Sequence, residues 1–209
     1  MRLLLVRHGE TPYNREGRVQ GQSREGLTPL GRLQAQGLGR LLRGYAPTAL
    51  YTSPLPRAVE TAHILAGHLG LDPLPLPALA EMHLGEMDGL TIAELRQRYP
   101  LFMEAWRKDP AGVQVPGGES LPQVQERAWH AVEDLLLRHP QETVVAVSHN
   151  FTILALLTRA LGLPLSAIRR FHLDLGGVVV LATGREGQWV LEAFNLREPV
   201  PVPQGSPAS

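Results

Sequence analysis

The sequence contains no cysteine among its 209 residues. This excludes disulfide bonds, thiolate nucleophiles and cysteine-ligated metal sites, and with them the disulfide-stapled secreted modules. Long apolar runs are also missing. The apolar run near the start ends at Arg7, well short of the ~7–15 residues of a signal-peptide core, and no later run approaches the ~18 apolar residues of a membrane span. We therefore expect a cytoplasmic protein with no membrane association.

Lysine is almost absent as well. Lys108 is the only one, which leaves 20 − 1 = 19 arginines among the basic residues. Guanidinium forks suit phosphate oxygens, but genomic base composition or adaptation to heat also produces such a bias, and composition does not choose between them. The 20 acidic residues bring the formal net charge to zero. This balance argues against a nucleic-acid partner, so any anion site must be local.

Strand and helix signals alternate along the chain. Short apolar runs predict strands at residues 2–6, 49–52 and 143–148, and each is followed by a segment with helical signals. Two further runs, at 178–182 and 189–194, predict a hairpin. This order indicates an α/β fold, a three-layer sandwich with a mostly parallel sheet flanked by helices.

Capping signals predict where the helices begin. Thr28 and Ser53 each precede a proline, a combination typical of a helix start, and Asn150 is placed to cap a helix over residues 151–161. Capping-box spacings predict two more helices, and they are formed by Thr91 with Glu94 and by Ser120 with Gln123. The segment 109–119 between these two helices has the composition of a loop.

The length favours one domain, given a prior of ~150 residues per domain. We expect that domain to cover residues 1–197 and to carry a short cap insertion at about residues 84–119. The remaining residues, 198–209, are rich in proline and are predicted to form a disordered tail.

Basic side chains follow three of the predicted strands. Arg7 and His8 come after the first, Ser53 and then Arg57 after the second, and His149 after the 143–148 strand. Sites in open α/β sheets lie outside the carboxyl ends of the strands. The sequence therefore predicts that two arginines and two histidines meet at one edge of the sheet.

That combination suits phosphoryl transfer, which needs positioning and positive donors around three charged oxygens. One histidine can attack phosphorus, while the second, kept cationic, hydrogen-bonds an oxygen. The backbone N–H of Gly9 can approach the anion closely, because glycine has no side chain in the way. An acid that protonates the leaving oxygen is still required.

Other site types fit the sequence less well. Metal binding by His8, His83 and His149 is conceivable, but none of them belongs to a short ligand pair such as H-x-x-x-H. The chain has no G-x-G-x-x-G order, no phosphate-binding G-K-[ST] and no G-x-S-x-G nucleophile turn. We expect neither a metal nor an organic cofactor.

Taken together, four motifs resemble the histidine phosphatase superfamily, also called phosphoglycerate mutase-like. They stand in the family's order and extend from the first residue to about residue 160. The motifs are L-V-R-H-G-E-T at 5–11 with Asn14, S-P-L-P-R-A at 53–58 with Thr61, L-A-E at 79–81 with Gly85, and V-S-H at 147–149.

The resemblance implies a role for each matching residue. His8 is the implied nucleophile, which forms a phosphohistidine, and Glu81 is the implied carboxylate, which protonates the leaving oxygen and later activates water. The implied ligands of the phosphoryl group are Arg7, Arg57, His149 and Asn14. The implied substrate-binding positions are Gln20, Gly21 and Asn150, the last of which replaces a glycine common among relatives. Glu10 is left open between an orienting role and a capping role.

The family contains both mutases and phosphatases. Mutases that depend on a bisphosphorylated cofactor carry a tyrosine where this chain has Leu84, and they have a more basic insertion. The P-G-G-E-S stretch at 116–120 instead looks like that of small phosphatases such as the alpha-ribazole phosphatase. The resemblance therefore favours a metal-independent phosphomonoesterase acting on a small phosphorylated metabolite. Alternatives are a phosphoglycerate mutase and a non-catalytic phosphate-binding module, and a homodimer is possible in each case.

Overall fold

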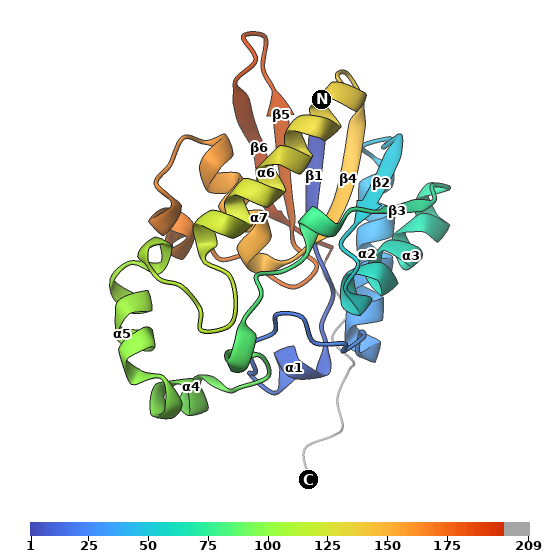
Figure 1. The fold of residues 1–209 in the computed structure, drawn as a ribbon. Helices are drawn as coiled ribbons and strands as arrows, with labels where there is room; N and C mark the ends of the chain where they lie inside the picture. The colour runs from blue at the N-terminus through green and yellow to red at the C-terminus, as the bar shows by residue number, and fades with distance from the viewer. Residues whose placement is uncertain (199–209) are drawn as a thin grey trace.

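The computed structural model describes residues 1–198 (Figure 1). Its strands are β1 (Arg2–Arg7), β2 (Ala49–Thr52), β3 (Pro73–Pro75), β4 (Thr143–Ser148), β5 (Val178–Thr183) and β6 (Trp189–Leu196). Its α-helices are α1 (Pro12–Arg15), α2 (Pro29–Arg43), α3 (Pro56–Leu69), α4 (Ile92–Arg98), α5 (Pro100–Lys108), α6 (Leu121–Arg138) and α7 (Asn150–Ala160). Short 3-10 turns cover Pro77–Leu79, Gly85–Met87, Pro110–Gly112 and Leu165–Arg170. The tail predicted at 198–209 lies outside the described residues except for Glu198, which forms an ion pair with Arg40.

The six strands form one mixed sheet in the order β3-β2-β4-β1-β5-β6. The pairs β1–β4, β2–β4 and β2–β3 are parallel. The pairs β1–β5 and β5–β6 are antiparallel, and β5 and β6 are joined as the predicted hairpin. The α/β architecture predicted from the sequence is therefore confirmed, with the hairpin as an antiparallel edge.

Alternate residues of the central strands face two separate cores. Leu3 and Leu5 of β1 belong to the core that includes α6 and α7 residues, whereas Leu4 and Val6 belong to the core that includes α2 and α3 residues. All four are fully buried, as the alternating faces of a strand covered on both sides require. Figure 1 shows α6 and α7 on the near side of the sheet. The wholly apolar sequence of β1 thus reflects a middle layer between two helical layers.

Two helices of the 84–119 segment, α4 and α5, lie to one side of the sheet in Figure 1. The capping box of Thr91 and Glu94 begins α4 as predicted. Pro100 then begins α5, a helix that the sequence signals did not predict. The ring of Trp106 in α5 meets that of Phe151 edge-on, with 5.6 Å between centroids. Aromatic packing therefore joins the cap helices to the start of α7.

Two predicted helix starts are wrong by one or two residues. Ser53 does not cap α3; the cap position is Leu55, whose backbone is extended. A residue that precedes proline is disfavoured in helical conformation, so the helix cannot begin before Pro56. Asn150 is not a cap either, but the first residue of α7, and His149 occupies the cap position without a side-chain capping bond.

Candidate active site

The carboxyl ends of the three parallel strands β1, β4 and β2 bring the predicted basic residues together. His8 follows β1 and His149 follows β4, and their ring centroids are 5.1 Å apart. Arg57 in the first turn of α3 reaches the same place: its Nε donates to Nε2 of His8 at 3.3 Å. All three side chains are buried. The strand-end rule therefore located the cluster correctly.

The His8 ring is held in one tautomer by its own loop. Its Nδ1 lies 2.7 Å from the carbonyl oxygen of Gly9. A carbonyl only accepts hydrogen bonds, so Nδ1 carries the proton and Nε2 keeps the free electron pair. That pair faces the Arg57 guanidinium. The atom of His8 able to attack phosphorus is therefore Nε2.

Arg57 is itself fixed by the loop over residues 21–23. Its Nη2 donates to the carbonyl oxygen of Gly21 at 2.7 Å, and its Nη1 donates to that of Ser23 at 3.2 Å. The loop is anchored in turn by Asp88, whose carboxylate accepts from the backbone N–H groups of Gly21 and Gln22 at 2.9 and 2.7 Å. Both backbone groups of Gly21 are thus engaged within the protein, and its link to the cluster is through Arg57.

Ser53 orients the second histidine. Its Oγ lies 2.7 Å from Nε2 of His149 and also accepts from the backbone N–H of Leu55 at 3.2 Å. The latter bond turns the chain between β2 and α3, as serine hydroxyls commonly do. The sequence placed Ser53 in a family motif and assigned it a capping role. The structure shows that its hydroxyl contacts the histidine instead.

Four buried polar atoms within residues 1–198 have no hydrogen-bond partner. They are Arg7 Nε, Gln20 Nε2, Ser23 Oγ and His149 Nδ1. Buried polar atoms in folded proteins are normally paired. Each of these four belongs to a segment that contacts the His8–Arg57–His149 cluster or adjoins it in the chain. Three of them are nitrogens that can donate a hydrogen bond, His149 Nδ1 when it carries a proton.

Gln20 and Asn14 are positioned through Thr11. The Thr11 hydroxyl donates to Oε1 of Gln20 at 2.9 Å, which fixes the amide so that its NH₂ group is the unpartnered end. Oδ1 of Asn14 accepts from the Thr11 backbone N–H at 3.1 Å in a capping box that begins α1. Arg7 is held by a hydrogen bond from Nη1 to the carbonyl oxygen of Leu173.

Glu81 caps helix α7 from outside that helix. Its Oε2 accepts from the backbone N–H of Phe151 at 3.1 Å, and its Oε1 accepts from that of Thr152 at 3.3 Å. A carboxylate is favoured at a helix N-terminus, where the first N–H groups have no partner within the helix. This external cap explains why α7 begins at Asn150 without the predicted asparagine cap. The side chain is only 4% exposed.

Burial and positive neighbours govern the charge state of the cluster. Desolvation, followed by the charges of Arg57 and Arg7, holds the pKa of His8 well below its usual range. Desolvation and Arg57 do the same to the pKa of His149. The cationic form of this histidine beside a phosphoryl oxygen therefore stays a prediction. Desolvation also lowers the pKa of Arg57 to about 10, against the opposing charge of Glu81, and leaves this arginine cationic at neutral pH. A dianionic ligand in the cluster would favour the protonated form of His149.

Gly9 and Glu10 fix the loop that carries His8, and the N–H of Gly9 does not have the predicted role of approaching an anion. The N–H of Gly9 donates to the Thr61 hydroxyl at 3.2 Å, so it is not directed at an anion. A Cβ on Gly9 would lie 2.4 Å from the carbonyl oxygen of Gly31, which makes glycine a requirement of packing against α2. Glu10 accepts from the hydroxyl of Thr28, the cap of α2, at 2.7 Å. Both residues fix the His8 loop to α2.

Sequence reasoning missed two functional candidates in this site. Asp88 and Ser23 belong to none of the quoted motifs. Only contacts across the fold reveal them, because Asp88 binds a loop 66 and 67 positions away.

The described residues contain no group of three His, Asp or Glu side chains placed to hold a metal ion. Every helix within residues 1–198 is also too short or too polar to span a bilayer.

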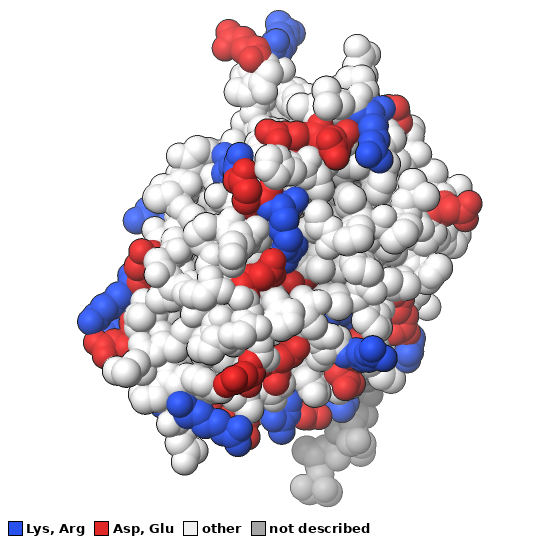
Figure 2. Space-filling view, viewed as in Figure 1, with Lys and Arg blue, Asp and Glu red and all other residues white. Residues whose placement is uncertain are grey.

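The fold and the site define an α/β protein with a buried site lined by histidine and arginine side chains. Figure 2 shows acidic and basic side chains interspersed on one face, so the surface there carries no single-sign patch. A family model described as the histidine phosphatase superfamily (branch 1) matches residues 3–197. The chain belongs to that family, as its motifs indicated.

Named relatives include both phosphatases and mutases. A protein of Hydrogenobacter thermophilus named phosphoserine phosphatase 1 is 33% identical over 83% of this chain and 82% of its own length. A probable phosphoglycerate mutase of Cronobacter sakazakii is 35% identical over 83% of this chain and 80% of its own length. The structure of a mycobacterial glucosyl-3-phosphoglycerate phosphatase superimposes with a TM-score of 0.85 at 32% identity, and the match covers 93% of this chain and 98% of the other.

Proposed function

We propose that the protein is a metal-independent phosphomonoesterase that hydrolyses a small phosphorylated metabolite through a phosphohistidine on His8. The observation that carries the proposal is a set of buried nitrogen atoms without a partner, Arg7 Nε, Gln20 Nε2 and His149 Nδ1, on residues that belong to the cluster of His8 or adjoin its loops in the chain. A phosphoryl group has the negative charge and the acceptor oxygens to pair with them. The names of the phosphatase relatives support the same reaction class.

In the proposed first step, Nε2 of His8 forms a bond to phosphorus as the bond from phosphorus to the ester oxygen breaks. The electron pair of the broken bond leaves with the oxygen, which takes a proton from Glu81. Arg57 transfers its Nε hydrogen bond from His8 to a phosphoryl oxygen, and so frees the attacking electron pair. Arg7 and His149 stabilise the charge on the other oxygens, which is the main contribution a protein makes to phosphoryl transfer.

In the proposed second step, the Glu81 carboxylate takes a proton from water. The water oxygen forms a bond to phosphorus while the bond from phosphorus to Nε2 breaks. This returns His8 to its neutral form and Glu81 to its protonated form, and releases inorganic phosphate. The three roles of nucleophile, acid and charge stabiliser are supplied by side chains, so the proposal requires no metal ion.

Phosphatase is proposed over mutase because of the surroundings of Leu84. This residue, where mutases carry a tyrosine, lines an apolar pocket with Phe151 and Trp106. A mutase has to retain a second phosphoryl group, which such a lining does not bind. A non-catalytic phosphate-binding module would need neither a nucleophile nor an acid, yet His8 and Glu81 are both buried beside the arginines.

We also propose that residues 1–197 form one domain with a cap at about 84–119. The residues proposed to line the substrate side of the site are Asn14, Gln20, Gly21 and Asn150. We further propose that the protein acts in the cytoplasm. The absence of cysteine supports the cytoplasmic location. A homodimer is compatible with this proposal and is not required by it.

Product analysis tests the proposed reaction. Purified protein is incubated with a panel of metabolite phosphates, including phosphoserine and 3-phosphoglycerate, with and without a chelator. We expect release of inorganic phosphate that the chelator does not change. Isomerised phosphoglycerate appearing faster than free phosphate would favour the mutase alternative. Saturable phosphate binding without turnover of any substrate would favour the binding module.

A further inference from the structure

Glu81 lies in a segment without regular secondary structure, residues 80–84, between two 3-10 turns. No helix or strand ladder fixes its backbone. A general acid must be held within hydrogen-bond reach of the oxygen it protonates. The position of this carboxylate therefore depends on side chains from other parts of the chain.

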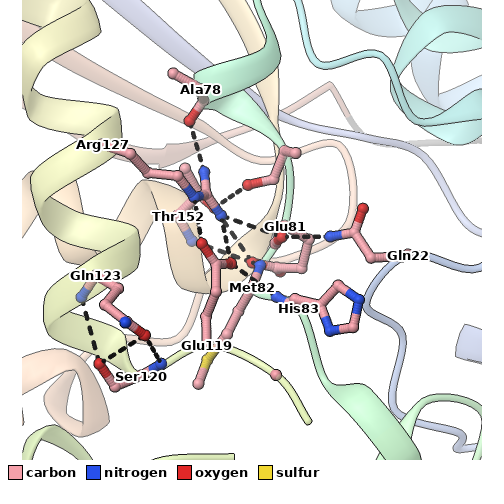
Figure 3. Close-up of polar contacts among 12 residues, drawn as sticks. Gln22, Ala78, Glu81, Met82, His83, Glu119, Ser120, Gln123, Arg127 and Thr152 are labelled. Atoms are coloured by element: carbon pink, nitrogen blue, oxygen red, sulfur yellow. Dashed lines mark hydrogen bonds and ion pairs between the residues drawn. The ribbon is translucent and has the colours of Figure 1, made fainter.

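One ion pair holds this segment on both sides of Glu81 (Figure 3). Arg127, on α6, donates from Nη1 to the carbonyl oxygen of Ala78 at 2.7 Å and from Nη2 to that of Glu81 at 3.2 Å. Its partner Glu119 accepts from the backbone N–H of His83 at 2.9 Å, and the backbone N–H of Glu119 donates to the carbonyl oxygen of His83 at 2.8 Å. The contacts thus begin three residues before Glu81 and end two residues after it.

The two side chains of the pair are joined through two hydrogen bonds. Arg127 Nε lies 2.8 Å from Glu119 Oε1, and Arg127 Nη2 lies 3.0 Å from Glu119 Oε2. Their side chains are only 26% and 25% exposed. A paired, partly buried fork of this kind is far more restricted than a surface ion pair between flexible side chains. Neither residue touches the His8 cluster through a hydrogen bond within residues 1–198.

We propose that the Arg127–Glu119 pair is a positioning device for the Glu81 carboxylate. Gln22 and Thr152 also donate to the segment, to the carbonyl oxygens of Glu81 and Ala80 at 2.9 and 2.8 Å. The ion pair fixes the backbone on both sides of Glu81, so that its side chain reaches the N-terminus of α7. Arg127 and Glu119 are positioning residues and not catalytic residues. The inference rests on the proposed function, because it assumes that Glu81 transfers the proton.

The leaving group of the substrate separates positioning from general stability. An aryl phosphate such as 4-nitrophenyl phosphate releases a stable phenolate and needs little protonation, whereas glycerol phosphate releases an alkoxide that does need it. The substitution Arg127→Gln should therefore lower kcat/KM, which reports the steps up to release of the leaving group, for glycerol phosphate by about tenfold or more, a fraction of the ~10²–10⁴ that general acid catalysis supplies. For 4-nitrophenyl phosphate we expect a change in kcat/KM of about twofold, because the acid contributes little to the first step there.

Two further variants serve as controls for this experiment. Arg127→Lys keeps the charge but not the fork, and should give an intermediate effect with the same substrate bias. Arg159→Gln is the matched control. Arg159, on α7, forms a 2.6 Å ion pair with Glu126, the residue before Arg127 on α6, and this pair has no contact with the Glu81 segment among the hydrogen bonds of residues 1–198. We expect this control to leave the ratio of the two substrates unchanged. Equal losses of kcat/KM for both substrates in the Arg127 variants, or no loss, would overturn the inference.

Amide exchange provides a readout that does not need turnover. The N–H groups of Phe151 and Thr152 donate to the Glu81 carboxylate, so they should exchange faster in Arg127→Gln and at the wild-type rate in Arg159→Gln. If the wild-type chain hydrolysed no phosphomonoester and this exchange still responded, the proposed function would fail while the positioning role stood. Unchanged exchange together with an unchanged substrate ratio would remove the positioning role and leave the proposed function intact.

Discussion

The Nε of Arg57 donates to Nε2 of His8 at 3.3 Å, while its two terminal nitrogens hold the carbonyl oxygens of Gly21 and Ser23. One arginine therefore connects the nucleophile after β1 with the loop over residues 21–23. Its side chain is fully buried, and its positive charge helps to keep His8 neutral and nucleophilic. Arg57 thus has two roles: it holds the loop over residues 21–23, and its charge lowers the pKa of His8.

Replacing Arg57 by lysine tests both roles. A lysine ammonium cannot reach Gly21, Ser23 and a phosphoryl oxygen together, so kcat/KM should fall by about 10²-fold or more, the range for loss of one preorganised donor. Steady-state kinetics measure the loss. Arg32→Lys, which alters an exposed ion pair with Glu60, is the control and should stay within about twofold. An Arg57→Lys variant that kept half of the wild-type kcat/KM would contradict the assignment.

The 2.7 Å contact between Ser53 and His149 leads to a second prediction. In Ser53→Ala the imidazole loses the group that orients it, and its free Nδ1 no longer points reliably at an oxyanion. Inhibition by orthovanadate should weaken by about fivefold to tenfold, as expected for ~1–1.5 kcal/mol of hydrogen bonding. Competitive inhibition constants give the comparison with wild type. Unchanged vanadate affinity would show that Ser53 only shapes the turn before α3.

The lowered pKa values of His8 and His149 predict how stability depends on pH. Both histidines titrate at lower pH in the folded protein than in the unfolded chain. The unfolded chain therefore binds more protons below about pH 6.5, and the free energy of unfolding should fall as the pH drops from 6.5 to 5. Each histidine contributes up to about 1.4 kcal/mol per pH unit.

Urea unfolding at pH 7, 6 and 5 measures this dependence. The His149→Gln variant should show a shallower fall than wild type, because it lacks one of the two buried imidazoles. The carboxylates whose pKa values are lowered, such as Glu126, affect stability at more acidic pH, so they contribute little to the change between pH 6.5 and 5. Parallel curves for the two proteins would mean that His149 is not held neutral by burial.

Asp88 gives a prediction that no sequence motif suggested. Asp88→Asn removes the charge that two backbone N–H groups share and places an amide NH₂ near one of them. The loop that positions Arg57 should loosen, and kcat/KM should fall by about tenfold, in line with ~1.5 kcal/mol for a charged hydrogen bond. Asp72→Asn, on the loop after α3, serves as the control. Full activity in Asp88→Asn would mean that the loop keeps its shape without this anchor.

The sequence predicted the layers of the fold well because their signals are local. The apolar runs of β1 and β4, the capping box of α6 and the cap and proline that begin α2 all appear where expected. The predicted cluster of Arg7, His8, Arg57 and His149 also assembles, since the carboxyl ends of parallel strands share one edge. Whether its members carry out the proposed steps stays a prediction.

The missed features depend on partners far apart in the chain. Helix α7 starts at Asn150 because the carboxylate of Glu81, some 70 positions earlier, caps it. The Gly9 N–H is taken by Thr61, and Asp88 is revealed only by the loop it binds. No local pattern records such contacts. Helix α5 was missed for a different reason: only Tyr99 separates the proline that begins it from the end of α4.

The most direct test of the central claim is to trap the phosphoenzyme. The protein is mixed with a radiolabelled phosphomonoester, quenched within milliseconds, digested and analysed by mass spectrometry. We predict a phosphoryl group on Nε2 of His8 that is stable in alkali and labile in acid, and that is absent from His8→Ala. A label that survives in His8→Ala, or that appears on another residue of the wild-type chain, would contradict the assignment of His8 as the nucleophile.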